Sequence, residues 1–162
     1  MIGTDADLPE NFDLLMTPGI RPGDLYVGAS GINGRGVYAA RDFATGTIIE
    51  ICPVILVPAA QRPALESTVI VEYYYEWGDA GGVALGFGSL YNHSYEPNAV
   101  YRKHMDRALV IVSALRSIAC GEEITINYNG DPEDKNPIWN WAKDEEPDSA
   151  RSGDSPPAGS GG

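Results

Sequence analysis

The sequence predicts a single, mainly β domain. Its 162 residues are close to the roughly 150 residues of an average domain, which is enough to bury one hydrophobic core. The 19 glycines and 12 prolines indicate many turns. The segments between these turns are rich in β-branched and aromatic residues, as strands are. Together these observations favour one strand-rich domain over several domains or a helical bundle.

The expected strands start after a turn-rich segment and continue to residue 128. A hairpin turn is expected at Asn33-Gly34, because this pair adopts the left-handed conformations that tight hairpin turns require. Residues 62–65 predict one helical turn, and the glycines of residues 83–90 predict an approach to a loop. The expected strands are residues 24–28, 37–40, 47–51, 54–57, 68–77, 98–103, 107–114 and 123–128.

Three regions of the chain differ in composition. Residues 1–21 form an acidic leader, residues 22–143 hold the expected folded domain with an aromatic segment at its end, and residues 144–162 form an acidic tail rich in Ser, Gly and Pro. Such a tail buries too little apolar surface to offset the conformational entropy that folding removes. We therefore predict that the tail is disordered.

The charge of the chain limits its expected partners. The formal net charge is −12 at pH 7, and a field of this sign repels phosphate backbones and anionic lipids. Neither nucleic acid nor a membrane is therefore an expected partner, whereas a basic protein is. The longest apolar stretch, residues 51–60, is also shorter than the roughly 20 residues that a membrane helix needs.

The cysteines give no sign of a metal site. Only Cys52 and Cys120 occur, far apart and without a Cys-x-x-Cys pattern. The first residues lack the basic and apolar regions of a secretory signal. A reducing cytoplasm is the expected location, with the nucleus as the alternative in a eukaryote. The sequence does not predict the oligomeric state.

Three clusters interrupt the strands and are candidates for a functional site. The first is Gly34-Arg35-Gly36, which a hairpin turn alone would also explain. The second is Asn92-His93-Ser94-Tyr95-Glu96-Pro97-Asn98, where Asn92 and His93 offer donors and acceptors to a polar ligand. A neutral histidine bonded to the backbone is the alternative for His93. The third cluster, residues 121–128, ends in Tyr128, which is otherwise a half-buried strand aromatic.

In this order the three clusters resemble the motifs of the SET-domain protein-lysine methyltransferases. That family carries Gly-x-Gly, then Asn-His-Ser-x-x-Pro-Asn, then Glu-Leu-x-Phe-Asp-Tyr. The resemblance covers roughly residues 22–131. It implies the family's β-clip-like fold, in which small curved sheets surround a knot-like crossing near the C-terminal end.

The resemblance also implies a cofactor site. S-adenosylmethionine is the expected cofactor, and no metal is expected. The backbone of Gly34, Arg35 and Gly36 is expected to lie against the methionine part of the cofactor, since glycine is needed where backbone approaches a ligand closely. The resemblance implies that Asn92 and the backbone of His93 bind the amino group and the adenine of the cofactor.

The resemblance also implies roles for aromatic residues at three positions. Tyr128 corresponds to the family's catalytic tyrosine and also contacts the cofactor. Tyr101 falls in the substrate channel, where a tyrosine or phenylalanine in some members helps to decide how many methyl groups are added. Trp139, or Trp141, stands where an aromatic residue often stacks on adenine. An aromatic clip that packs the C-terminal segment on the core is the alternative for these tryptophans.

Several positions depart from the family pattern. Cys52 stands where many members have the tyrosine of a Tyr-x-Gly motif, so one wall of the substrate channel is expected to differ. Residues 89–91 and Ile126-Asn127 also differ from the usual motif residues. The cysteine-rich zinc cluster that follows the domain in many histone-modifying members has no counterpart in this sequence. Residues 137–141 are therefore the candidate lid.

The implied reaction requires a neutral lysine amine, although the pKa of lysine in solution is about 10.4. A narrow apolar channel and the positive sulfonium both disfavour the ammonium form, so the proton leaves to water without a carboxylate base. The predicted function is protein-lysine methylation, with Tyr128 aligning the methyl group.

A non-catalytic SET-like module that binds a basic peptide is the alternative function, because Cys52 replaces a channel tyrosine. An acidic structural protein that shares only the β fold is disfavoured, because it gives no reason for the three motifs to occur in order.

Overall fold

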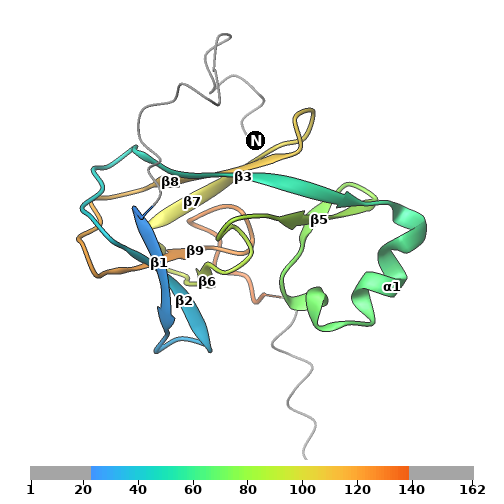
Figure 1. Cartoon of the computed structure of the whole chain (residues 1–162), viewed down its shortest axis with the longest axis horizontal. Coiled ribbons are helices and arrows are strands. Elements are labelled where there is room, and N and C mark those ends of the chain that lie inside the picture. Colours follow the sequence, from blue (N-terminus) through green and yellow to red (C-terminus); the bar gives the residue numbers. More distant parts are fainter. Residues whose placement is uncertain (1–22, 139–162) are drawn as a thin grey trace, which may run out of the picture.

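The computed structural model describes residues 23–138, which form two curled antiparallel-rich sheets (Figure 1). The predicted fold class, mainly β with small curved sheets, is confirmed. The first sheet has the strand order β1 (Leu25–Ala29), β2 (Arg35–Ala39), β9 (Glu123–Ile126), β6 (Asn92–His93). The second has the order β4 (Tyr75–Trp77), β5 (Ala80–Ala84), β3 (Ile48–Val57), β8 (Leu109–Ala114), β7 (Ala99–His104).

Helical structure is confined to the segment between β3 and β4. It consists of the 3-10 turn η1 (Ala59–Gln61), the short helix α1 (Arg62–Glu66) and the 3-10 turn η2 (Val69–Glu72). This segment lies at the opposite end of the molecule from the β1–β2 hairpin (Figure 1). The predicted helical turn at residues 62–65 is confirmed by α1. Among the described residues, no helix is long and apolar enough to cross a membrane.

The predicted hairpin at Asn33-Gly34 is confirmed. Strands β1 and β2 pair antiparallel from Leu25↔Ala39 to Ala29↔Arg35. The Ser30 amide donates to the Gly34 carbonyl at 3.0 Å, which closes the loop. Gly34 has a φ of +48°, a left-handed conformation that residues with a Cβ adopt at a cost.

Strand β3 is continuous where two strands were expected. It pairs with β8 from Ile48 to Pro53 and with β5 from Val54 to Val57. Pro53 therefore marks a change of partner, not an end of the strand. Its missing N–H costs no ladder bond at this junction, and its carbonyl accepts from the Leu85 amide at 2.8 Å.

The expected strand at residues 68–77 is wrong in its first part. Residues 69–72 form η2, and only Tyr75–Trp77 is a strand. The Thr68 hydroxyl accepts from the Ile70 amide at 3.2 Å, a local bond that competes with pairing in a sheet. Val69 is 67% exposed, so its β-branched side chain gains nothing from a sheet face there.

The loop expected at residues 83–90 is confirmed from residue 85 onward, whereas residues 83–84 still belong to the end of β5. The strand runs through Gly81 and Gly82, and its last two residues are Val83 and Ala84. A Cβ on Gly82 would lie 2.9 Å from the Trp77 ring and 3.0 Å from Val54. Glycine, which lowers strand propensity, is thus required here by aromatic packing from β4.

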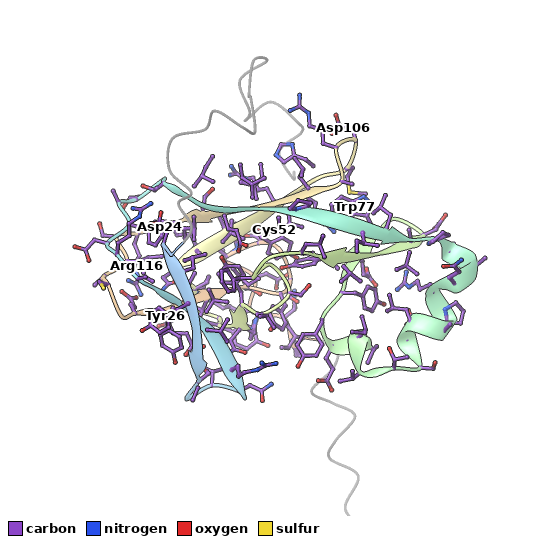
Figure 2. The ribbon with its side chains drawn as sticks, in the orientation of Figure 1. Asp24, Tyr26, Cys52, Trp77, Asp106 and Arg116 are labelled. Carbon is purple, nitrogen blue, oxygen red and sulfur yellow. The ribbon has the colours of Figure 1, made fainter. Side chains whose placement is uncertain are left out.

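The core draws on both sheets. Its cluster includes β2, β3, β8 and β9 side chains together with residues of the connections. Cys52 lies in the interior, whereas Asp106 lies in the turn beyond β7 (Figure 2). The largest fully buried side chains are Tyr91, Phe43, Ile49, Ile118, Ile124, Ile126, Val37, Val110, Val112, Asn98 and Cys52.

Strand β6 was not among the expected strands, and it positions the site. It pairs parallel with β9, with Asn92 opposite Thr125 and His93 opposite Ile126. This pairing places the middle and last motifs side by side, where the crossing of the chain is expected. Because β2 flanks β9 on its other side, the glycine motif at the start of β2 joins the same sheet.

Candidate active site

Asn92 joins the glycine motif to the last motif. Its side-chain Nδ2 donates to the carbonyls of Asn33 and Arg35, each at 3.2 Å, and to Oε1 of Glu123 at 2.8 Å. Asn92 is 7% exposed, so this amide is held in one place. The three sequence motifs therefore meet at one side chain.

Glu123 is the second junction, and sequence reasoning did not select it as a site residue. Besides Asn92, its carboxylate accepts from the Ser30 hydroxyl at 2.8 and 3.0 Å and from the Tyr38 hydroxyl at 3.2 Å. Burial and the neighbouring Glu123 raise the pKa of Tyr38. Glu123 opens the last motif, which was the available signal, but its partners lie 31 to 93 residues away.

The two glycines of the first motif are needed for different physical reasons. A Cβ on Gly36 would lie 2.1 Å from Glu123 Oε1 and 3.1 Å from Asn92 Nδ2. Gly36 is thus required by this junction, whereas Gly34 is required by its positive φ and has no atom near its Cβ position. Arg35, between them, is exposed and contributes its carbonyl.

His93 carries a buried donor. Its Nδ1 accepts from the Tyr128 amide at 3.2 Å, so in the neutral ring Nε2 carries the proton. Nε2 is buried and has no hydrogen-bond partner within residues 23–138. Burial lowers the pKa of His93, which favours the neutral form. A ligand that accepts a hydrogen bond can satisfy this group.

Tyr128 follows β9 and packs on the same histidine. The ring centroids of His93 and Tyr128 are 5.2 Å apart. The Tyr128 hydroxyl donates to the Tyr91 carbonyl at 2.9 Å, and burial, with a smaller effect of Tyr73, raises its pKa to about 12. The hydroxyl therefore stays protonated at neutral pH.

Tyr101, on β7, lies beside Tyr128. Its hydroxyl donates to the Tyr128 carbonyl at 3.1 Å, and burial raises its pKa to about 12. Cys52, on β3, is fully buried. Burial and the neighbouring Glu50 hold the pKa of its thiol well above the usual range. Cys52 is thus a neutral, unreactive side chain of the interior.

A second carboxylate that the sequence did not single out is linked to Tyr128 through Tyr91. Glu50 is 7% exposed. Its Oε2 accepts from the Tyr91 hydroxyl and its Oε1 from the Phe87 amide, both at 2.8 Å. Since Tyr91 offers its carbonyl to Tyr128, Glu50 holds the residue that positions the Tyr128 hydroxyl. No cluster of His, Cys, Asp and Glu that could hold a metal occurs in the described part of the chain.

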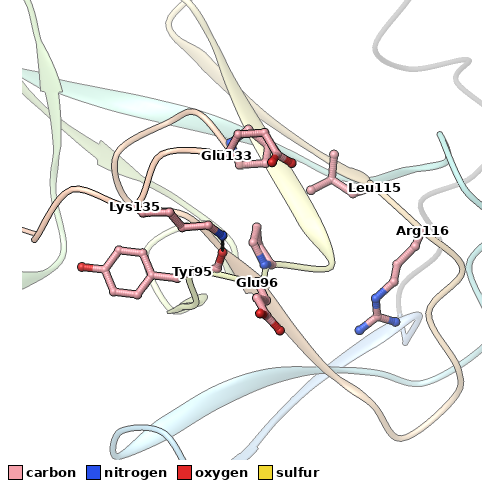
Figure 3. Close-up of a pocket in the computed structure, with 8 residues that line it drawn as sticks. Tyr95, Glu96, Leu115, Arg116, Glu133 and Lys135 are labelled. Atoms are coloured by element: carbon pink, nitrogen blue, oxygen red, sulfur yellow. Dashed lines mark hydrogen bonds between the residues drawn. The ribbon is translucent and has the colours of Figure 1, made fainter.

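A pocket of about 650 Å³ is lined in part by Tyr95, Glu96 and Pro97 of the middle motif, but by none of the residues to which the sequence assigned a catalytic, channel or cofactor role (Figure 3). Lys135 crosses it and donates to the Tyr95 carbonyl. The candidate site is therefore defined by the hydrogen bonds of Asn92, His93 and Tyr128, and not by this pocket. Trp139 and Trp141 lie outside the described residues, as do residues 1–21 and 144–162. The lining residues are Tyr95, Glu96, Pro97, Leu115, Arg116, Pro132, Glu133 and Lys135.

In this β fold the three motifs meet at Asn92, and Tyr128 of the last motif lies beside His93 of the middle motif. Residues 34–129 match the SET domain family, and the chain belongs to that family. A similar protein is the histone-lysine N-methyltransferase of Schizosaccharomyces pombe that is specific for H3 lysine-37. It is 36% identical over 97 residues, which are 59% of this chain and 66% of that relative. The match thus spans just under two thirds of the relative's length.

Solved structures agree on the fold. A Plasmodium falciparum protein described as a proposed histone methyltransferase is 31% identical, with a TM-score of 0.53 over 67% of this chain and 95% of that chain. A humanized mutant of the Chaetomium thermophilum Polycomb Repressive Complex 2, bound to an inhibitor, gives a TM-score of 0.55 at 18% identity. That match covers 64% of this chain and 14% of the other, and it bears on the fold alone.

Proposed function

We propose that the protein is a lysine methyltransferase that uses S-adenosylmethionine to methylate lysine side chains of a protein. The observation that carries this proposal is the single hydrogen-bonded assembly of the three motifs around Asn92, His93 and Tyr128. The family match and the fission yeast relative support the same reaction.

The residues present fit the cofactor. The buried Nε2–H of His93 lacks an acceptor within residues 23–138, and a purine nitrogen or a carboxylate supplies one. Gly34, Arg35 and Gly36 present backbone, and Asn92 fixes that backbone in place. S-adenosylmethionine, when bound, supplies a methyl group on a positively charged sulfur as the electrophile for an amine.

In this proposal Tyr128 aligns the reacting groups and does not transfer a proton. With a pKa of about 12, its hydroxyl remains a neutral donor at pH 7 and does not accept the proton of the lysine ammonium. The surrounding tyrosines are neutral too, so the environment disfavours the charged amine and the proton leaves to water. The Tyr91 carbonyl fixes the orientation of the Tyr128 hydroxyl, which makes alignment its main contribution.

For the substrate we propose a basic segment of a protein, with histone H3 as the first to test. The net charge of −12 attracts such a segment at low ionic strength. The fission yeast relative is named for a lysine of H3. The steering part of this attraction weakens as salt is added.

The first experiment needs no substrate. S-adenosylmethionine is titrated by calorimetry into the wild type, Asn92→Ala and Tyr128→Phe, with thermal unfolding as the check on folding. Asn92→Ala frees the glycine motif from the last motif, so we expect its affinity to fall at least about 10-fold. Tyr128→Phe keeps the affinity and lowers methyl transfer to histone H3 by at least about 100-fold. Absence of binding by the folded wild type would favour a non-catalytic peptide-binding module.

For the location we propose the cytoplasm, or the nucleus in a eukaryote. Cys52 and Cys120 are both free, one buried and one exposed, which suits a reducing compartment. Microscopy of a fluorescent fusion protein tests this location.

A further inference from the structure

A third tyrosine, Tyr75, comes from a distant part of the chain and packs against the site tyrosine Tyr101. It lies on β4 and packs against the core. Its ring meets that of Tyr101 edge-on, with centroids 5.1 Å apart at 67°. Its hydroxyl donates to the Gly88 carbonyl at 2.6 Å. The ring is thus fixed at both ends, by a neighbouring ring and by a backbone acceptor.

The same tyrosine adjoins the position where the sequence departs from the family pattern. Burial raises the pKa of Tyr75 well above its usual range, and the nearby Tyr101, Cys52 and Tyr128 add to this effect in that order. The residue that accepts its hydrogen bond packs on Cys52, because a Cβ on Gly88 would lie 2.8 Å from the Cys52 sulfur. Tyr75 therefore lies among all three of the residues assigned to the channel and to catalysis.

The packing around Cys52 leaves no room for an aromatic ring from β3. Cys52 is fully buried, and the Cβ position of Gly88 is also 2.8 Å from the Cβ of Ala84. A larger side chain at Cys52 would displace Gly88, and with it the acceptor of Tyr75. The small residue on β3 and the tyrosine on β4 are thus a matched pair.

We propose that Tyr75 supplies, from β4, the aromatic wall of the lysine channel that β3 lacks, and that it positions Tyr101 and so limits the number of methyl groups added. This inference rests on the proposed methyltransferase function. A ring held edge-on keeps Tyr101 from moving away from a lysine amine that has gained methyl groups. Loosening Tyr75 enlarges the space available to that amine.

The test compares Tyr75→Phe and Tyr75→Leu with the wild type. The control is Tyr74→Phe, because the Tyr74 hydroxyl bonds Glu66 at 2.8 Å and Arg62 at 3.0 Å instead. The probes are recombinant histone H3 and a library of peptides that each contain one lysine. Mass spectrometry measures the ratio of di- and trimethylated to monomethylated product, and calorimetry measures the affinity for S-adenosylmethionine.

We expect Tyr75→Phe, which keeps the ring but loses its anchor, to raise this product ratio at least about 3-fold and to raise the KM of the peptide. Tyr75→Leu changes both further in the same direction, and neither variant changes cofactor affinity. The Tyr74→Phe control matches the wild type. If Tyr75→Leu does not fold, Tyr75→Phe decides alone.

A wild-type product ratio and KM in folded Tyr75 variants would overturn this inference while leaving the proposed function intact. So would an equal change in Tyr74→Phe, or a loss of cofactor affinity in place of the altered ratio. If neither the wild type nor Tyr74→Phe methylates any probe, the proposed function fails and this inference fails with it.

Discussion

Two carboxylates hold the two halves of the site in different ways. Glu123 lies in the smaller sheet and accepts from side chains of three separate segments, those of Ser30, Tyr38 and Asn92. Glu50 lies in the larger sheet, is almost fully buried, and accepts from the Phe87 amide and the Tyr91 hydroxyl. Glu123 thus assembles the glycine motif, whereas Glu50 supports the acceptor of the Tyr128 hydroxyl.

The difference separates cofactor binding from alignment of the reaction. The partners of Glu123 are Asn92 and two residues that flank the glycine motif, so a change at Glu123 is expected to lower the affinity for the cofactor. One partner of Glu50, Tyr91, offers the acceptor of the Tyr128 hydroxyl, so a change at Glu50 is expected to lower both stability and methyl transfer. His93 lies between the halves, because its backbone belongs to β6 and its ring accepts from Tyr128.

The largest expected effect comes from breaking the buried half. Glu50→Ala leaves the Phe87 N–H and the Tyr91 O–H without their acceptor, and each buried unpaired donor costs about 1–3 kcal/mol. We therefore expect the free energy of unfolding to fall by about 2–6 kcal/mol in denaturant titrations. In the folded fraction, methyl transfer falls more than cofactor affinity. Glu72→Ala, an exposed carboxylate at the end of η2, is the control, and an equal loss there would contradict the assignment.

The next effect tests the cofactor half. In Gly36→Ala the new methyl group occupies the place of Glu123 Oε1, so the carboxylate must move and give up bonds to Asn92 and Ser30. We expect affinity for S-adenosylmethionine to fall about 10- to 100-fold in calorimetry. Gly31→Ala is the matched control, because no atom lies within 4 Å of its Cβ position. Unchanged affinity in Gly36→Ala would separate Glu123 from the cofactor site.

The smallest expected effect concerns the residue between the halves. Burial lowers the pKa of His93, so the folded state favours the neutral ring. This contribution to stability is complete above the unfolded pKa of about 6.5 and is lost as pH falls below it. Between pH 7.5 and 5.5 we expect the Tm of the wild type to fall about 1–2 °C more than that of His93→Gln. Parallel curves for the two proteins would show that His93 does not titrate differently on folding.

Much of the fold could be predicted because its signals are local. The strands predicted at residues 98–103 and 107–114 match β7 and β8 to within two residues at each end, and Asn33-Gly34 predicted the first hairpin. The expected strand at residues 68–77 failed for the complementary reason. Its composition is typical of a strand, but the Thr68 hydroxyl bonds the Ile70 amide and Val69 is exposed, and both favour a 3-10 turn over a strand.

The sequence by itself determined the fold class, the order of the motifs and the candidates Asn92, His93 and Tyr128, because short-range patterns and spacing record them. The tertiary structure decided which side chains form hydrogen bonds or pack against one another. Tyr75 was visible only as a strand aromatic, although its ring contacts Tyr101 across the larger sheet. Glu50 and Glu123 were ordinary acidic residues until the chain brought their donors to them from 31 to 93 residues away. Hydrogen bonds and ring contacts act over a few ångströms, so the path of the chain, and not its local pattern, selects these partners.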